Sequence, residues 1–212
     1  MLPTQTRLAS SRSPSNRSRA LLLALPLATG AALIVHMVSD RSLVAALALT
    51  GGLALFAAGL AVRRLPPAAL ADAKRRARLG VIAGAAGLAA YDVSRVLLVA
   101  GTGLETKPFK ALPLFGRGLL GSEASDTAAW VAGAGYHVAN GIGFAVAYCL
   151  AVRKPSWRTG IAWGLLLEAV MIAFYPSWLQ IEALKEFVTM SLFGHIAYGG
   201  TLGGVAGRRG RV

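Results

Sequence analysis

The sequence predicts an all-α polytopic membrane protein, a transmembrane helical bundle of about six spans. Of its 212 residues, 55% are hydrophobic and only 15% are charged, compared with roughly 25% charged residues in soluble domains. The apolar residues form continuous runs of about 20, the length that crosses a hydrocarbon core as a helix. The 22 Lys and Arg residues lie mostly in short blocks between these runs, a distribution typical of membrane proteins.

The chain begins with a polar, basic segment, residues 1–19, for which we expect a disordered cytoplasmic tail. The next run also resembles a signal peptide, because a basic stretch precedes it and small residues at 28–32 could form a cleavage region. It continues to Val38, however, and this length favours a retained helix. Residues 20–207 then form the predicted membrane domain, with spans at 20–38, 42–62, 79–100, 129–151, 160–178 and 187–207, followed by a basic tail at 208–212.

The distribution of basic residues predicts the orientation of the chain. Sixteen Lys and Arg residues fall in the two tails and in the connections after the second and fourth spans, and five fall in the connections on the other side. The positive-inside rule therefore places both termini in the cytoplasm, and a composition rich in Ala, Gly, Leu and Arg favours a bacterial plasma membrane. A net charge of +13 would indicate nucleic-acid binding in a soluble protein. Here it follows membrane topology, so we expect membrane lipids and no nucleic acid as partners.

The longest connection on the outer side contains residues 107–121, in which apolar and basic side chains mix with two prolines and three glycines. Such a composition suits a segment that lies at the membrane interface or dips shallowly into it. We expect either a loop packed on the end of the bundle or a functional lid.

Five ionisable residues lie inside the predicted spans: Asp92, Arg95, His137, Glu168 and His195. An Asp or Arg at a helix centre costs roughly 2.5–3.5 kcal/mol of insertion free energy, so these side chains must face the bundle interior and find partners or be neutralised. Four of them continue rows of residues spaced by four that contain glycine, and membrane helices approach closely along such rows. Asp92, His137 and His195 each lie eight residues, roughly 12 Å, from the outer ends of their spans. We therefore expect one polar cluster in the outer half of the bundle.

This cluster indicates a membrane-embedded, metal-dependent enzyme acting on a lipid-like substrate. Two histidines and a carboxylate can hold zinc or iron and leave one position open for water or substrate. We predict Asp92, His137 and His195 as these metal ligands. A metal-bound water with a pKa of about 7 can attack an ester, an amide or a phosphodiester.

Four further residues are candidates for catalysis: Arg95, Asn140, Glu168 and Tyr198. Arg95 can hold a phosphate or carboxylate through two hydrogen bonds. Asn140, Tyr198 or the nearby Tyr136 can donate to a developing oxyanion. Glu168 lies about 15 Å from the outer end of its span and has no basic residue in that span. Its plainer interpretation is a protonated carboxyl group bonded to a neighbouring carbonyl.

The same residues support other classes of protein. Asp, Glu and His side chains form proton relays in transporters, so a proton-coupled transporter or a small-molecule-binding membrane protein is the main alternative. Haem held by His137 and His195 across two facing helices is another. In a purely structural or partner-stabilising subunit, Asp92 pairs with Arg95 and the histidines bond across helices. Gly-rich helix faces would then also support a homo-oligomer.

Three stretches resemble small bacterial membrane proteins of uncharacterised function: Tyr136–Gly141, Phe193–Gly199 and the Tyr175-Pro176 pair at the end of the fifth span. The resemblance covers the C-terminal half of the chain and implies a six-helix bundle without implying an activity. The set of histidines and carboxylates is also similar to that of membrane-embedded zinc hydrolases of the alkaline-ceramidase type. This chain departs from that pattern because it has three histidines in all, no HxxxH pair and one span fewer.

Overall fold

The computed structural model describes residues 16–39, 41–179 and 184–210, with side chains for 20–39, 41–174 and 184–210. Within these ranges the chain is helical and contains no strand, which confirms the all-α prediction. The helices are α1 (Asn16–Ser39), α2 (Leu43–Arg64), α3 (Pro67–Thr102), α4 (Ala111–Leu120), α5 (Asp126–Ala151), α6 (Trp157–Leu179) and α7 (Leu184–Arg209). Of the predicted tails, residues 1–15 and 211–212 lie outside the described ranges, and α1 and α7 take in the residues next to them.

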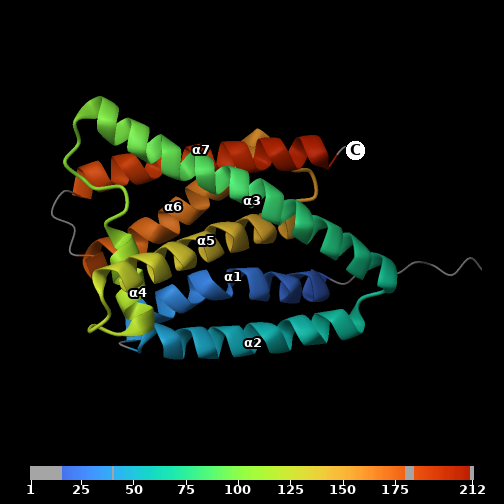
Figure 1. Cartoon of the computed structure of the whole chain (residues 1–212). Helices are drawn as coiled ribbons and strands as arrows, with labels where there is room; N and C mark the ends of the chain where they lie inside the picture. The colour runs from blue at the N-terminus through green and yellow to red at the C-terminus, as the bar shows by residue number, and fades with distance from the viewer. Residues whose placement is uncertain (1–15, 40, 180–183, 211–212) are drawn as a thin grey trace, which may run out of the picture.

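Six long helices run the length of the bundle in alternating directions, and the short α4 crosses one end of it (Figure 1). In the order in which they pack on one another, the long helices are α2, α1, α5, α3, α7 and α6. Helix α1 also touches α6, but only weakly. The series α1, α5, α3, α7 and α6 therefore closes on itself. These five helices therefore form a ring with one loose junction, between α1 and α6, and α2 packs on the outside of α1.

Glycine residues allow the helices to approach closely. A Cβ atom added at Gly203 of α7 would lie 2.9 Å from the Cα of Gly160 in α6, and one added at Gly164 would meet the carbonyl oxygen of His195. Between α3 and α5, a Cβ at Gly80 would lie 2.6 Å from the backbone. These positions have no room for a side chain, which confirms that the small-residue rows mark packing faces.

Helix α3 begins at Pro67 rather than at the start of the predicted span, 79–100. Proline is favoured in the first turn of a helix, and Asp72 accepts hydrogen bonds from Arg75 (2.6 Å) and Arg76 (2.8 Å) on the next turn. Burial raises the pKa of the Asp72 carboxyl group, but these hydrogen bonds outweigh it and hold that pKa below its usual value. The basic block between the second and third predicted spans is therefore helical, and α3 extends beyond its apolar part.

The outer segment predicted at 107–121 contains helix α4, which packs on α5. Leu112 is buried in this contact, and a Cβ at Gly116 would collide with the backbone of α5. The connection before α4 is tied to α7, because the Thr106 N–H donates to Glu186 Oε2 (3.0 Å). The segment is thus a packed cap on one end of the bundle.

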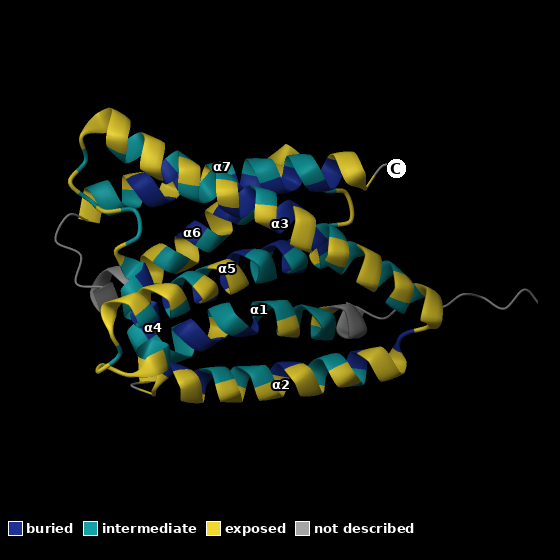
Figure 2. Ribbon diagram, in the orientation of Figure 1, coloured by how far each residue is buried: buried dark blue, intermediate teal, exposed yellow. Residues whose placement is uncertain are grey.

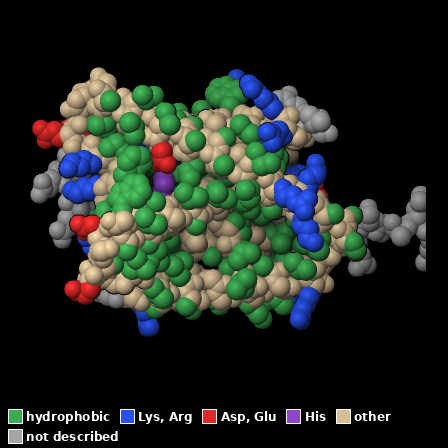
Figure 3. All heavy atoms as spheres, viewed as in Figure 1, with side chains coloured by type: hydrophobic (Ala, Val, Ile, Leu, Met, Phe, Trp, Pro, Cys, Tyr) green, Lys and Arg blue, Asp and Glu red, His purple; other side chains and the backbone are tan. Residues whose placement is uncertain are grey.

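Four helices in the described part of the chain are long and apolar enough to cross a membrane: Ala20–Ser39, Leu43–Arg64, Pro67–Thr102 and Trp157–Phe174. Figure 2 shows buried residues on the faces that the helices turn to one another and exposed residues on the outer faces. On α2 the exposed residues include Leu53, Leu55 and Phe56. In Figure 3, Lys and Arg side chains gather toward the two ends of the molecule, with a largely hydrophobic belt between them. A belt of this extent suits contact with lipid.

Candidate functional site

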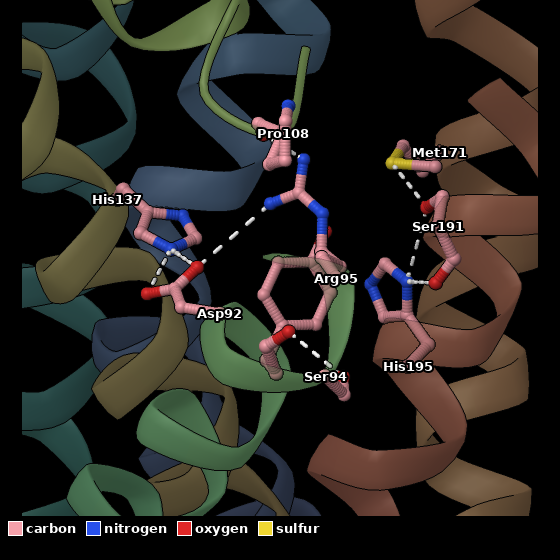
Figure 4. Close-up of polar contacts among 9 residues, drawn as sticks. Asp92, Ser94, Arg95, Pro108, His137, Met171, Ser191 and His195 are labelled. Carbon is pink, nitrogen blue, oxygen red and sulfur yellow. Dashed lines mark hydrogen bonds and ion pairs between the residues drawn. The ribbon is translucent and has the colours of Figure 1, made fainter. Parts of the chain in front are cut away.

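Five of the predicted site residues come together from four helices, toward the end of the bundle that α4 covers: Asp92 and Arg95 of α3, His137 of α5, Glu168 of α6 and His195 of α7. They form two carboxylate–histidine pairs with Arg95 between them. Figure 4 shows Asp92 and His137 on one side of Arg95, and His195 on the other.

The first pair joins α3 to α5. His137 Nε2 lies 3.1 Å from Asp92 Oδ1 and 3.3 Å from Oδ2. The Asp92 and His137 side chains are 28% and 20% exposed, so this pair lies near the edge of the bundle. Arg95 Nη1 is 3.8 Å from Asp92 Oδ1, beyond hydrogen-bonding distance. Asp92 therefore pairs chiefly with His137, and its predicted salt bridge with Arg95 is the longer contact.

The second pair joins α6 to α7 and is more deeply buried. His195 Nδ1 lies 2.7 Å from Glu168 Oε2 and 3.1 Å from the carbonyl oxygen of Ser191. The Ser191 hydroxyl donates to the same Glu168 oxygen (2.6 Å). Glu168 Oε1 is buried and has no hydrogen-bond partner among the described residues. Because Nδ1 is engaged on this side, His195 turns its other nitrogen, Nε2, toward the centre of the cluster (Figure 4).

The glycine rows bring this second pair together. Gly164 packs against the carbonyl oxygen of His195, and Glu168 lies one turn further along α6 on the same face. On α7, Ser191 lies one turn before His195. The closest approach of the two helices therefore sets the carboxylate beside both the hydroxyl and the imidazole.

Arg95 lies at the centre of the cluster, and its side chain is 9% exposed. The guanidinium carbon is 4.7 Å from the ring centroid of Tyr91 and 5.8 Å from that of Phe109, both within cation–π range. Nη2 donates to the carbonyl oxygen of Pro108, just before α4. Nε is buried and lacks a hydrogen-bond partner in the described part of the chain.

Tyr91 contacts both histidines and is a site residue beyond those predicted from the sequence. Its ring centroid lies 5.8 Å from that of His137 and 5.0 Å from that of His195. The sequence does hold a signal for it, since Gly87, Tyr91 and Arg95 are spaced by four. This row contributes to the buried face of α3, and so does the row Gly80, Gly84 and Leu88 that leads to Asp92.

The other predicted catalytic residues have different roles. The Tyr198 hydroxyl donates to the Gly141 carbonyl oxygen (2.6 Å), and the Tyr136 hydroxyl donates to that of Thr29 (2.7 Å). A hydroxyl has one hydrogen to donate, so neither tyrosine has a donor left for an oxyanion in this structure. Both hold helices together instead. Asn140 is buried, and its Oδ1 has no hydrogen-bond partner among the residues described.

A cavity of about 430 Å³ lies against the cluster, within the roughly 300–1,000 Å³ range of ligand pockets. Its walls are mostly apolar and come from the five helices of the ring and from α4 with the segment before it. The polar and aromatic-polar residues that line it are Tyr91, Arg95, His137, Asn140, Trp163, His195 and Tyr198. Three of these carry a buried atom without a hydrogen-bond partner in the described ranges: Arg95 Nε, Asn140 Oδ1 and Trp163 Nε1.

The predicted metal ligands are divided between the two pairs. Asp92 and His137 are in contact, whereas His195 lies with Glu168 on the other side of Arg95. Among the described residues, no group of three or more His, Cys, Asp and Glu side chains is placed to hold a metal ion. This arrangement does not fit one zinc or iron centre, and we assign no step to a metal.

A family model described as a family of unknown function, DUF6789, matches residues 74–211. This range covers most of α3 and all of α4 to α7, including both carboxylate–histidine pairs. No curated protein and no solved structure matches the chain.

Proposed function

We propose that this chain, which belongs to the DUF6789 family of unknown function, is an integral membrane protein. In this proposal it takes a lipid-like amphiphile from the bilayer into its helical bundle. The cavity of about 430 Å³ beside the polar cluster carries this proposal. Mostly apolar walls with a few convergent polar groups are typical of ligand sites. An amphiphile matches both parts, because its tail can lie on the walls and its head at the cluster.

In this proposal all six long helices cross a bacterial plasma membrane, with both chain ends in the cytoplasm. Four helices support it by their own length and composition. Helices α5 and α7 have 26 residues each, which is long enough to span, and both pack against other long helices of the bundle. The start of α1 and the end of α7 lie at the same end of the bundle (Figure 1), as an even number of spans requires.

The loose junction between α1 and α6 is the proposed entrance. The cavity lining includes Ala31 of α1 and Leu166 and Val170 of α6, and all three are exposed residues. Exposed apolar residues in the cavity wall, where two helices pack weakly, support an opening at this junction. A molecule in the surrounding lipid can therefore enter sideways, without passing the polar ends of the helices.

A bulky side chain at this junction should prevent binding. Ala31→Phe adds a ring where α1 faces α6, and Ala48→Phe adds the same ring at an exposed position of α2, away from the cavity. We expect native mass spectrometry in a neutral detergent to detect bound amphiphile in the wild type and in Ala48→Phe, but not in Ala31→Phe. Equal binding by the two folded variants would exclude this entrance. A wild type that binds none of a panel of added amphiphiles would refute the proposed function.

Acid–base catalysis on the bound molecule is a second candidate, favoured by the position of Glu168 against His195 Nδ1 (2.7 Å). A carboxylate at Nδ1 holds an imidazole in one tautomer and stabilises its protonated form. In ester hydrolysis, Nε2 would accept a proton from water as the water oxygen bonds to the ester carbon. It would return that proton to the alcohol oxygen as the carbon–oxygen bond breaks.

This second candidate is tested with His195→Gln, which keeps a polar side chain of similar reach but cannot exchange a proton near neutral pH. Membranes from cells that produce the wild type or this variant would be compared by lipid mass spectrometry, with Ala48→Phe as the control. We expect one class of ester lipid to decrease with the wild type and the control only. Identical profiles for the wild type and a folded His195→Gln that binds amphiphile normally would leave binding as the function.

A further inference from the structure

Arg95 is a buried charged residue whose guanidinium group is only partly satisfied by hydrogen bonds within the described structure. Its side chain is 9% exposed, and a guanidinium group remains protonated in proteins. An uncompensated buried charge is strongly unfavourable. Within a predicted membrane span, water is not present to hydrate such a charge. Such a group therefore needs a counter-charge with good hydrogen-bonding geometry.

The carboxylates near Arg95 are engaged elsewhere. Asp92 lies 3.8 Å from Arg95 Nη1 but only 3.1 Å from His137 Nε2. Glu168 accepts the Ser191 hydroxyl and contacts His195. Among the described residues, the guanidinium group donates one hydrogen bond, from Nη2 to the neutral carbonyl oxygen of Pro108. Arg95 thus has Asp92 as a neighbour of opposite charge, at 3.8 Å, but no carboxylate within hydrogen-bonding distance in the described structure.

One donor of the guanidinium group has no partner among the described residues. The rings of Tyr91 and Phe109 lie within cation–π distance of it, and both residues line the cavity together with Arg95. Nε–H is a buried donor with no partner among the described residues. The Nε–H edge of a guanidinium group, with one Nη–H beside it, matches the two oxygens of a carboxylate or a phosphate.

We propose that Arg95 binds an oxyanion head group, a carboxylate or a phosphate, on the amphiphile that occupies the cavity. This inference rests on the proposed binding function and names the class of its ligand. Asn140 Oδ1, also buried and unpartnered, accepts a hydrogen bond from a hydroxyl of the same ligand. The tail follows the apolar lining toward Phe144 and Trp163, which lie nearer the opposite end of the bundle by their positions in α5 and α6.

The test compares three amphiphiles with the same saturated tail: a fatty acid, an alkyl phosphate and a fatty alcohol. Each is titrated against full-length protein in a neutral detergent, and binding is followed by native mass spectrometry or calorimetry. A charge-assisted pair of hydrogen bonds should make at least one of the two anions bind roughly ten- to a hundredfold more tightly than the alcohol. The affinities for the fatty acid and for the alkyl phosphate show which oxyanion the site prefers.

Arg95→Gln should abolish this preference while it leaves alcohol binding within a few-fold of the wild type. Alcohol binding by the variant also reports that the cavity has formed. Arg76→Gln is the matched control, because Arg76 lies in the same helix and donates to carbonyl oxygens at the end of α5, away from the cavity. It should keep the wild-type preference.

A wild type that binds the alcohol as tightly as both anions would overturn the inference and leave the proposed binding function intact. A wild type that binds none of the three would instead count against that function. If Arg95→Gln does not fold, Arg95→Lys replaces it, since lysine keeps the charge but lacks the two-donor edge. An undiminished anion preference in Arg95→Lys would also overturn the two-point contact.

Discussion

One methyl group added to α7 should destabilise the protein at Gly203 but not at the next residue, Gly204. A Cβ at Gly203 would lie 2.9 Å from the Gly160 Cα and would meet the carbonyl oxygen of Ser156, whereas a Cβ at Gly204 meets nothing within 4 Å. Both alanine substitutions gain a similar helix propensity, about 1 kcal/mol. Overpacking a tightly fitted position costs about 1–3 kcal/mol. The difference between the two variants isolates that cost, because the propensity cancels.

A stability change of 1 kcal/mol shifts the melting temperature by about 2–4 °C for a chain of this size. Gly203→Ala should therefore melt roughly 2–12 °C below Gly204→Ala. Thermal unfolding followed by circular dichroism, with both variants in the same neutral detergent, measures this difference. Equal melting temperatures would refute the close packing of α6 on α7, and with it the account of how Glu168 comes to lie beside His195.

Three further changes test individual contacts by the same unfolding assay. Glu168→Ala leaves His195 without its carboxylate and should cost about 1–3 kcal/mol of stability. Glu168→Gln keeps an oxygen acceptor and should cost less. Equal losses of stability in the two variants would argue against a specific pair. Tyr198→Phe frees the Gly141 carbonyl oxygen and should cost about 0.6–1.7 kcal/mol without altering amphiphile binding, and a loss of binding would place the Tyr198 hydroxyl in the ligand site. The folded-state pKa of Asp72 is lowered from the ordinary 3.8, so its contribution to stability is present above that value and is lost as pH falls through the folded pKa. Asp72→Asn should therefore reduce stability at neutral pH and flatten the acid side of the profile, and an unchanged acid side would contradict this assignment.

The positions of the helices follow closely from local patterns in the sequence. The second predicted span, 42–62, corresponds to Leu43–Arg64, and the fourth, 129–151, to Asp126–Ala151. Helix α3 begins before the third predicted span, 79–100, because hydropathy marks where a helix is apolar and not where it begins. Proline in the first turn and an Asp–Arg pair one turn later extend it into the basic block.

The residues of the candidate site could be predicted from the sequence, but the contacts between them could not. Spacing by four and depth along each span identified the ionisable residues, because both depend only on the geometry of a single helix. Partners depend on how two helices rotate against each other. The sequence predicted one cluster with Asp92, His137 and His195 as shared ligands, and a pair of Asp92 with Arg95 only in a structural alternative. The structure instead joins Asp92 to His137 and places Arg95 at the longer distance. Tyr91 was missed for the same reason, since its role comes from contact with both histidines.

The sequence by itself determined that this chain is helical, that its outer surface is largely apolar and that glycine rows carry its close contacts. These properties follow from composition and from a period that every helix shares. Only the tertiary structure decided that the ring of helices closes loosely between α1 and α6, that the cluster divides into two pairs, and that Arg95 has an unpartnered donor beside a cavity. Each of these depends on helices that are distant in the chain, and their relative rotation is set by where glycine backbones meet, which no single span specifies.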